Sequence, residues 1–235
     1  MIVRAFIFPT YFESKTIGHL LHRLVPELEK GEVVIVVDDS PESERRELRS
    51  TIEKFGNVTL LEGNVKAGRG FAVWRGMKYV VENHPQVSHL IESDCDGSHR
   101  LEDIQEISNF DASKDFVVGS RYLAGSRIID WSLMRRIMSR LLNFLIPRIL
   151  NLEVSDVTNG LRRYSRESAL ILLREEPKTS GFIYLSEQAK ILGSHGIHAV
   201  EIPIIFASRI AGNSSVTLLD LADSLKGLIK IIMMK

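Results

Sequence analysis

The sequence predicts an α/β fold: a mostly parallel, Rossmann-like sheet flanked by helices. Short apolar runs, rich in β-branched residues, alternate with longer amphipathic segments through the first 120 residues, which is the pattern of βαβ units. Apolar residues are 44% and charged residues 26% of the 235, as in ordinary globular domains. Polar and acidic clusters directly follow several of the apolar runs, where open parallel sheets bind their ligands.

The first half of the chain supplies the alternating elements. The predicted strands are residues 3–8, 33–37, 58–61, 89–93 and 116–119. Amphipathic helices are predicted between them at residues 14–30, 42–55, 70–83 and 101–109. Because parallel neighbours need right-handed crossovers through such helices, these strands should form one sheet.

The second half is less regular. A helix is expected over 131–150, kinked or ended by Pro147. Helices around 168–173 and 185–192, a strand over 198–206 and an amphipathic helix from residue 218 should follow. We therefore expect one domain over residues 1–215, extended by a C-terminal amphipathic helix over 216–235.

Charge is balanced overall but divided along the chain. The 30 basic and 30 acidic residues sum to zero, which disfavours a nucleic-acid binder that is basic throughout. Residues 121–166 hold nine Arg, three acids and no Lys, a net +6, so the remainder carries −6. Arginines interleaved with apolar residues favour contact with phosphate groups or lipid headgroups over a plain solvated basic face.

The sequence also bears on the compartment. Its one cysteine, Cys95, cannot form an internal disulfide, so nothing points to an oxidising environment. The N-terminus lacks the basic start and cleavage site of a signal peptide. No apolar run reaches the ~18 residues that a membrane-spanning helix needs. These features predict a cytoplasmic location.

The triplet Asp94-Cys95-Asp96 follows a predicted strand. Its two carboxylates could converge on a hard divalent cation, to which a diphosphate would add oxygen ligands. The alternative is a solvated turn. Between two carboxylates, Cys95 should have a raised pKa, which argues against a catalytic thiol. His99 is the one histidine placed near this pair for chemistry.

Three other loops follow strands or open helices. Residues 38–40 (Asp-Asp-Ser) could cap the next helix or accept hydrogen bonds from a ribose or base. In residues 9–13, Tyr11 could stack on a base while Glu13 accepts its hydrogen bonds, or the segment is an ordinary turn. In residues 67–70, we favour a tight glycine turn over a phosphate site.

Eight segments in order resemble the family-2 glycosyltransferases, most closely the dolichol-phosphate (polyprenyl-phosphate) mannosyltransferases. They are PTYFE (9–13), VVDDSPES (37–44), AGRGFAVWRGM (67–77), ESDCDGS (92–98), GSRYLAGS (119–126), WSLMRRIMSR (131–140), SDVTNGLRRYSRE (155–167) and VEIPIIFASRIAGNSS (200–215). The resemblance covers nearly the whole chain and implies a glycosyltransferase A-type fold that binds a nucleotide sugar at the strand ends.

The resemblance also implies residue roles. It places the nucleotide sugar at Pro9, Tyr11, Glu13, Val37, Asp39, Asp94, Cys95, Asp96 and Arg209. It places Mg²⁺ or Mn²⁺ at Asp94, Asp96 and Ser98, and the acceptor phosphate at Arg121, Arg135 and Ser139. Among these, Asp96, Arg121 and Arg135 would carry catalysis. The sequence departs from the family at Ser98, usually Gln, at Phe12, usually Asn, and at residues 212–215, which lack the usual Lys.

The implied reaction is inverting transfer of a hexose, most simply mannose from GDP-mannose, to a polyprenyl or dolichyl phosphate at the cytoplasmic face of a membrane. Residues 140–152 and 218–235 could be interfacial helices or could pack on the core. A membrane-anchored subunit could be a partner, and no nucleic acid is expected.

Other functions stay open at this point. The donor could be UDP-glucose, or the acceptor could be a saccharide, with Asp130 as a candidate catalytic carboxylate. A non-catalytic, membrane-associated subunit is the plainest alternative. A sugar nucleotidyltransferase is disfavoured, because residues 9–15 lack a Gly-rich loop containing Arg and Lys.

Overall fold

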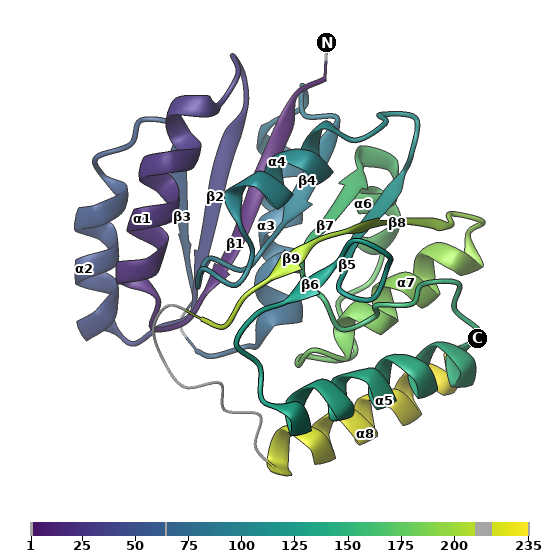
Figure 1. The fold of residues 1–235 in the computed structure, drawn as a ribbon. Helices are drawn as coiled ribbons and strands as arrows, with labels where there is room; N and C mark the ends of the chain where they lie inside the picture. The colour runs from purple at the N-terminus through teal and green to yellow at the C-terminus, as the bar shows by residue number, and fades with distance from the viewer. Residues whose placement is uncertain (1, 64, 210–217, 235) are drawn as a thin grey trace.

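The computed structural model describes residues 2–63, 65–209 and 218–234, with only the backbone for 218–223. Seven strands form one sheet in the order β3-β2-β1-β4-β7-β5-β8 (Figure 1). All neighbours in it are parallel except β7, which runs antiparallel to β4 and β5. The expected mostly parallel sheet is confirmed. Its strands are β1 (Arg4–Thr10), β2 (Val33–Asp38), β3 (Val58–Glu62), β4 (His89–Glu92), β5 (Phe116–Ser120), β7 (Arg162–Ser165) and β8 (Ala199–Pro203).

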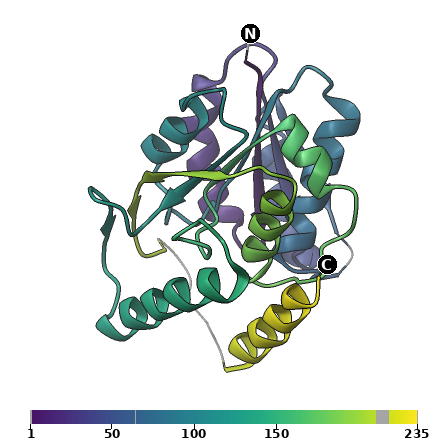
Figure 2. The ribbon, with the colours of Figure 1, turned by 90° about the vertical axis from the view of Figure 1, so that its right-hand side faces the viewer.

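Helices cover both faces of this sheet, as Figure 2 shows. One face carries α1 (Ser14–Leu24), α2 (Glu42–Ile52) and α4 (Leu101–Asn109). The other carries α3 (Arg69–Asn83), α6 (Arg166–Leu172) and α7 (Tyr184–Ser194). Helix α1 is shorter than predicted, because Pro26 lies in a separate 3₁₀ turn, η1 (Val25–Glu27).

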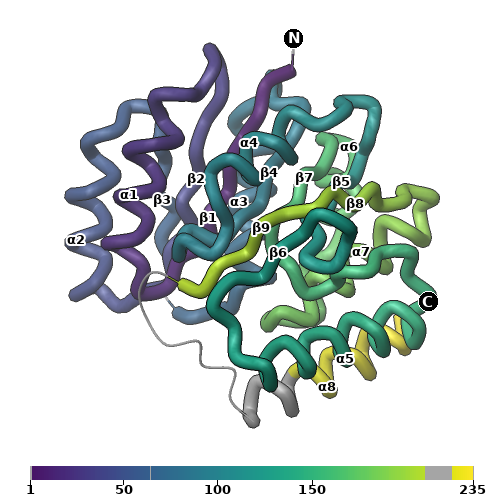
Figure 3. The backbone as a smooth tube through the Cα atoms, in the orientation of Figure 1, coloured from purple at the N-terminus to yellow at the C-terminus, as the bar shows by residue number. Residues whose placement is uncertain are grey.

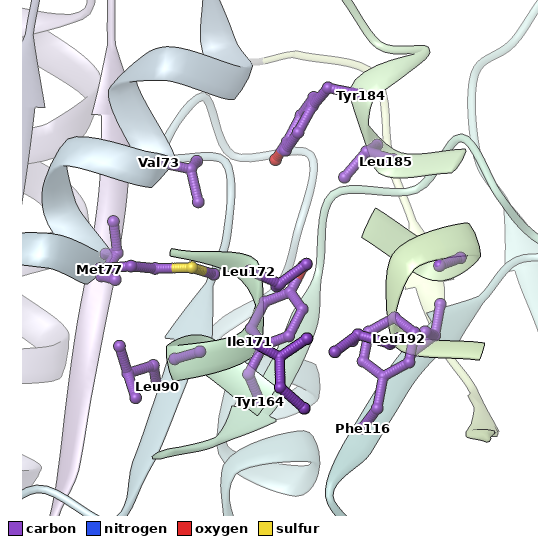
Figure 4. Close-up of a cluster of buried hydrophobic side chains, with 14 of the residues drawn as sticks. Val73, Met77, Leu90, Phe116, Tyr164, Ile171, Leu172, Tyr184, Leu185 and Leu192 are labelled. Atoms are coloured by element: carbon purple, nitrogen blue, oxygen red, sulfur yellow. The ribbon is translucent and has the colours of Figure 1, made fainter. Parts of the chain in front are cut away.

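The central strands are buried on both sides. Along β1, Ala5 and Ile7 belong to the core under α3, whereas Phe6 and Phe8 belong to the core under α1. Figure 4 shows the first of these cores, where the rings of Phe116 and Tyr164 stack with centroids 5.2 Å apart. Two-sided burial explains why these strands are continuous apolar runs in the sequence.

The sequence pattern does not predict β7, because its residues RRYS contain no apolar run. Arg162 and Arg163 lie in the middle of the sheet and are 0% and 1% exposed. Their guanidinium groups, and that of Arg166, donate to main-chain carbonyls of Phe110, Asp111, Lys114, Asn159, Val157, Leu185, His84, Val87 and Val81. These three arginines of the Arg-only segment therefore stabilise the fold, which corrects its interpretation as a phosphate- or lipid-binding surface throughout.

The predicted strand at 198–206 is divided in two. After β8, Ile204 separates off β9 (Ile205–Phe206), which pairs in parallel with β6 (Arg127–Ile128) in a second, two-stranded sheet. This small sheet brings Phe206 against Trp131, with ring centroids 5.4 Å apart in an edge-to-face contact. It thereby fixes the loop that leads into the next helix.

That helix is α5 (Leu133–Leu150). The hydroxyl of Ser132 caps it by accepting a hydrogen bond from the Arg135 N–H at 3.3 Å. Pro147 lies in its last turn and does not end it there; Asn151, with a φ of 52°, follows its end. Hence the helix begins two residues later than predicted, and its predicted end at residue 150 is confirmed.

The C-terminal helix α8 (Leu218–Ile232) packs against α5 and α7. Ile231 is fully buried in the core, whereas Leu225 is 61% exposed. Helix α8 therefore packs on the core along one side only. The expected boundary between residues 215 and 216 lies outside the described residues. In the described parts of the chain, no helix is both long and apolar enough to cross a membrane.

Candidate active site

Two carboxylates follow β4 at the carboxyl edge of the sheet. Asp96 is 2% exposed; its Oδ1 accepts a hydrogen bond from the Ser98 N–H at 2.9 Å, and its Oδ2 lies 2.7 Å from Nε of Arg209. The carboxylate of Asp94 pairs with Nη1 of Arg69. Both acids of the D-x-D triplet are thus paired with arginine, which is not the arrangement of a solvated turn.

Glu13, which follows β1, approaches the same triplet. The Cys95 thiol donates a hydrogen bond to Oε2 of Glu13 at 3.0 Å, and Nη1 of Arg209 lies 4.0 Å from Oε1. Burial raises the pKa of Glu13, and the hydrogen bond from Cys95 opposes that rise. Burial and the neighbouring Glu13 raise the pKa of the Cys95 thiol well above its usual value. The expected rise in the pKa of Cys95 is confirmed.

His99 lies buried beside the triplet and is neutral near pH 7. Its Nδ1 accepts a hydrogen bond from the Asp94 N–H at 3.2 Å, so its Nε2 carries the proton and donates to Oδ1 of Asn159 at 2.8 Å. Burial lowers the pKa of His99 to about 4. The imidazole therefore orients the main chain at Asp94 and adds no charge to the site.

Arg69 is a site residue that the sequence pattern missed. The guanidinium contacts Asp94 and donates to Oε1 of Glu92 at 2.9 and 3.2 Å. A Cβ at Gly160 would lie 2.4 Å from Nη2 of Arg69, so this glycine leaves room for the guanidinium. The favoured tight turn is borne out by Gly68, whose φ is 91°. The missed signal is a cation in that turn, at the start of a helix near the ligand-binding edge.

The acids that end β2 do not cap α2. Its N-cap is Pro41, and no side chain accepts a hydrogen bond there. Asp38 instead accepts from the Thr10 hydroxyl at 2.9 Å and thereby joins the ends of β1 and β2. The Asp39 carboxylate accepts from Arg75. Because a carboxylate offers about four acceptor positions, Asp39 keeps capacity for a ribose or base.

The other residues expected at the nucleotide lie on β1, β2 and the following loop. Pro9 and Val37 are neighbours in the parallel register, and both are buried. The side chain of Val37 belongs to the apolar core, so its main chain is the part that is available to a nucleotide. Tyr11 is 38% exposed, with Nζ of Lys66 4.2 Å from its ring centroid.

Arg121 is less available than the resemblance implies. It is 7% exposed, and its guanidinium donates to both oxygens of Asp156 at 2.8 and 2.7 Å and to the Thr158 hydroxyl at 2.7 Å. Asp156 is fully buried. A bidentate buried pair of this kind holds the guanidinium firmly. Arg121 can therefore attract an anion by its positive charge, but several of its N–H donors are already used within the protein.

Arg135 differs from the other site arginines. No carboxylate pairs with it in the parts of the chain that the structure describes; its guanidinium lies 3.8 Å from the ring centroid of Trp131. Burial lowers the pKa of Arg135, and repulsion from Arg121 and Arg209 lowers it further. The three cations therefore lie close enough to repel one another.

Ser139 lies one helical turn after Arg135 on α5. Its hydroxyl accepts a hydrogen bond from the Tyr122 hydroxyl at 2.6 Å, and Asn143 donates to its carbonyl at 3.0 Å. The predicted acceptor-phosphate residues are thus brought to the start of α5, beside the carboxyl edge that carries the D-x-D triplet.

The oxygen atoms at this edge fit a hard divalent cation. The Ser98 hydroxyl is buried and has no hydrogen-bond partner within the described ranges, and Asp94 and Asp96 supply carboxylates. Over those same ranges, no three His, Cys, Asp or Glu side chains gather so that they could hold a metal unaided. A nucleotide diphosphate would therefore have to complete the coordination.

The comparison with family models gives the class of protein to which this fold and site belong, the glycosyltransferases. The model of glycosyl transferase family 2 matches residues 5–170. The chain belongs to this family. The matched range includes the D-x-D triplet, Arg69 and Arg135, and it ends before Arg209.

Known relatives extend over most of the chain. The undecaprenyl-phosphate mannosyltransferase of Micrococcus luteus is 28% identical over 212 residues, which are 90% of this chain and 86% of the relative. The polyprenol monophosphomannose synthase of Mycolicibacterium smegmatis is 27% identical over 215 residues, 90% of this chain and 80% of the relative.

Among solved structures, glucosyl-3-phosphoglycerate synthase from Mycobacterium tuberculosis, in complex with Mn²⁺, UDP-glucose and glycerol 3-phosphate, is similar. The TM-score is 0.65 at 14% identity, over 100% of this chain and 81% of that one. At this identity the likeness concerns the fold alone, and the expected glycosyltransferase A-type fold is confirmed.

Proposed function

We propose that this protein transfers mannose from GDP-mannose to the phosphate of a polyprenyl lipid at a membrane surface, with inversion at the anomeric carbon. Family membership supports sugar transfer. The names of the two relatives, an undecaprenyl-phosphate mannosyltransferase and a polyprenol monophosphomannose synthase, support the sugar and the lipid class. The observation that carries the proposal is Arg135, a half-buried guanidinium without a carboxylate partner in the described ranges, beside two other arginines.

On the donor side, Tyr11, Glu13 and Asp39 would bind the nucleoside. Tyr11 offers an exposed ring for a base, and Glu13 and Asp39 offer carboxylates that accept hydrogen bonds. Arg209, which reaches both Glu13 and Asp96, would meet the diphosphate. When bound, Mg²⁺ or Mn²⁺ at Asp94, Asp96 and Ser98 would neutralise charge on the leaving diphosphate.

The chemistry is one displacement. An oxygen of the acceptor phosphate attacks the anomeric carbon, the bond from that carbon to the donor diphosphate breaks, and its electron pair leaves with the nucleoside diphosphate. A phosphate monoester has a second pKa of about 6, so its oxygen needs no general base near neutral pH. Arg121 and Arg135 would therefore act by holding two anions together in the reactive arrangement.

The surface of α5 supports a lipid-bound acceptor. A row of large apolar side chains on α5 points to solvent: Leu133, Met134, Ile137, Met138, Leu141, Phe144, Leu145 and Ile149. Arg136, Arg140 and Arg148 on the same helix are also exposed. An apolar row edged by arginine suits the boundary of an anionic bilayer, and the row starts beside Arg135. This surface is longer than the expected interfacial segment at 140–152.

The test is a transfer assay with the purified protein. Radiolabelled GDP-mannose, Mn²⁺ and vesicles that contain undecaprenyl phosphate should give a labelled lipid. Asp96→Asn should abolish the product while leaving the protein folded, because the amide has the shape of the carboxylate and its oxygen can still accept the hydrogen bond from the Ser98 N–H. UDP-glucose and a soluble saccharide serve as parallel arms. Transfer to the saccharide alone, for which Asp130 would be the candidate carboxylate, would overturn the proposal.

A further inference from the structure

Trp131 lies between the loop that leaves β6 and the start of α5, and it is 8% exposed. Its indole Nε1–H is buried and has no hydrogen-bond partner among the residues that the structure describes. Buried donors in folded proteins are nearly always hydrogen-bonded, and each exception calls for an explanation. A bound ligand whose oxygen accepts this hydrogen bond would be such an explanation.

The ring of Trp131 is surrounded by the acceptor-site cations. The guanidinium carbon of Arg135 lies 3.8 Å from the ring centroid, and that of Arg121 lies 5.3 Å away. Phe206 contacts the ring edge to face and prevents it from shifting. The indole that carries the unpaired N–H therefore lies next to two guanidinium groups, which attract anions.

The charges around Trp131 explain why an aromatic side chain, and not a carboxylate, contacts Arg135. Arg121 is paired with Asp156 and Arg209 with Asp96, whereas Arg135 has no such carboxylate in the described ranges. A carboxylate beside Arg135 would hold it in place but would also neutralise it. An aromatic face attracts a cation without adding a negative charge, so Arg135 stays available for a phosphate.

We propose that Trp131 is a binding residue of the acceptor-phosphate subsite: its Nε1–H donates to a phosphate oxygen, and its ring holds the guanidinium of Arg135. The inference rests on the proposed function, since it assumes a phosphate monoester as the acceptor. It adds a neutral donor to the two arginines and accounts for the buried N–H and the unpaired guanidinium together.

Two substitutions separate the roles of the N–H and the ring. Trp131→Phe keeps an aromatic face and loses the donor, and it should raise the KM for farnesyl phosphate about tenfold. Trp131→Leu loses both and should raise that KM further. In each case the KM for the sugar nucleotide should stay unchanged. A purely structural role would instead change both KM values and the thermal midpoint together.

A direct measurement uses the wild-type chain and its other tryptophan as the control. Trp74 donates its indole N–H to the Glu175 carbonyl at 3.1 Å, and Trp74→Phe assigns the two indole signals in a nitrogen-15 spectrum. Farnesyl phosphate should shift the Trp131 indole proton downfield and leave that of Trp74 in place. Farnesol, which lacks the phosphate, should move neither signal.

The two possible failures are distinguishable. If farnesyl phosphate is mannosylated by the wild type, but the Trp131 signal does not move and Trp131→Phe keeps the wild-type KM, the role of Trp131 is wrong and the proposed function stands. If the wild type neither binds nor mannosylates any polyprenyl phosphate, the proposed function is wrong, and the role of Trp131 falls with it.

Discussion

Acidic side chains at the carboxyl edge of the sheet are paired with arginines from distant parts of the chain. The pairs are Asp39 with Arg75, Asp94 with Arg69, Asp96 with Arg209, and Asp156 with Arg121. In the ligand-free chain these charges compensate one another. An incoming diphosphate must therefore compete with carboxylates for the guanidinium groups, and the arginine without such a competitor, Arg135, should be the strongest attraction for a phosphate.

The first prediction concerns Arg69. Glu92 is fully buried, and burial raises its pKa while Arg69 opposes that rise. Arg69→Met should lower the free energy of unfolding by about 3 kcal/mol, because the buried carboxyl loses the cation that hydrogen-bonds it and, of the two arginines near it, keeps only the field of Arg162. It should also reduce transfer, because Asp94 loses the contact that holds it. Urea unfolding and initial rates measure the two effects.

A double variant separates these effects of Arg69. Adding Glu92→Gln to Arg69→Met removes the uncompensated buried acid, so most of the lost stability should return. Transfer should stay low, because Asp94 still lacks its partner. Recovery of activity together with stability would mean that Arg69 acts only through Glu92 and has no part in holding the D-x-D triplet.

The second prediction is a pH dependence due to His99. Its pKa is about 4 in the folded chain, against 6.5 for an unperturbed histidine. Between these values the unfolded chain binds more protons, so acidification favours unfolding, by up to about 3 kcal/mol in total. Relative to His99→Gln, the wild type should lose stability as the pH falls from 6.5 to 4 and keep a constant difference above 7. Parallel profiles across that window would contradict the buried, neutral imidazole.

At the scale of elements, β7 is a strand that places charged side chains inside the sheet. It is the one antiparallel strand in the seven-stranded sheet of the described chain, and it connects β4 to β5 through two buried arginines. The buried charges are tolerated there because main-chain carbonyls, among them those of Asn159, Leu185 and Asp111, accept hydrogen bonds from both guanidinium groups. The arginines therefore supply donors to main-chain carbonyls such as those of Phe110 and Lys114.

The third prediction tests this role of β7. The guanidinium of Arg163 donates to the carbonyls of Phe110, Asp111 and Lys114, in the loop between α4 and β5. Arg163→Met should lower the free energy of unfolding by about 2–4 kcal/mol, because it removes a hydrogen bond from each carbonyl and leaves Asp111 only its bond from the Lys114 N–H. The matched control is Arg46→Met on the exposed surface of α2, which should cost less than about 0.5 kcal/mol. Equal costs for the two variants would contradict a structural role for Arg163.

Elements that bury apolar side chains were predictable, and those that depend on distant partners were not. The runs that form β1, β2 and β5 are apolar in themselves, so their periodicity and length suffice. Strand β7 becomes a strand only because β4 and β5 flank it and distant carbonyls accept its donors. Likewise, β9 is separated from β8 because it pairs with β6. In that pairing Ile205 lies opposite Arg127, which is 78 residues earlier in the chain.

The candidate site follows the same division. Asp94 and Asp96 could be found because they directly follow a strand, at the edge where ligands bind. Asp156 could not, because its pairing with Arg121 spans 35 residues and its own surroundings are those of a polar loop. Arg69 was not predicted as a site residue, because the glycines on either side of it were sufficient to explain residues 67–70 as a tight turn. Local patterns therefore located the edge, whereas the charge pairs required the fold.

At the scale of the whole molecule, the arginines of the +6 segment divide into buried and exposed groups. Within the +6 segment, Arg121, Arg162 and Arg163 are buried, whereas Arg136 and Arg140 on α5 face solvent. Helices α5 and α8 lie side by side at the end of the molecule toward which the parallel strands run (Figure 3). Exposed apolar side chains of α8, and Met233 just after it, add to the row on α5: Leu225, Ile229, Ile232 and Met233. Monomeric proteins rarely expose so large an apolar surface without a partner.

The last prediction is that this surface binds an anionic bilayer. The protein should float with vesicles of phosphatidylglycerol and float less with phosphatidylcholine alone, because the arginines of α5 add attraction to the apolar contact. Salt should weaken binding without abolishing it, since only the charged part is screened. Ile137→Glu with Leu141→Glu should prevent flotation and leave the thermal midpoint nearly unchanged, because these side chains are 51% and 46% exposed.

A matched control lies on another face of the molecule. Leu170 on α6 is 48% exposed, and α6 lies well away from α5 and α8 in Figure 1. Leu170→Glu carries the same kind of change at the same exposure, so it should still float. The double variant on α5 should keep its activity toward water-soluble farnesyl phosphate and lose it toward undecaprenyl phosphate in vesicles, because only the second acceptor requires the bilayer. If the double variant floats like the wild type, or Leu170→Glu fails equally, the apolar row on α5 is not the membrane surface of this enzyme.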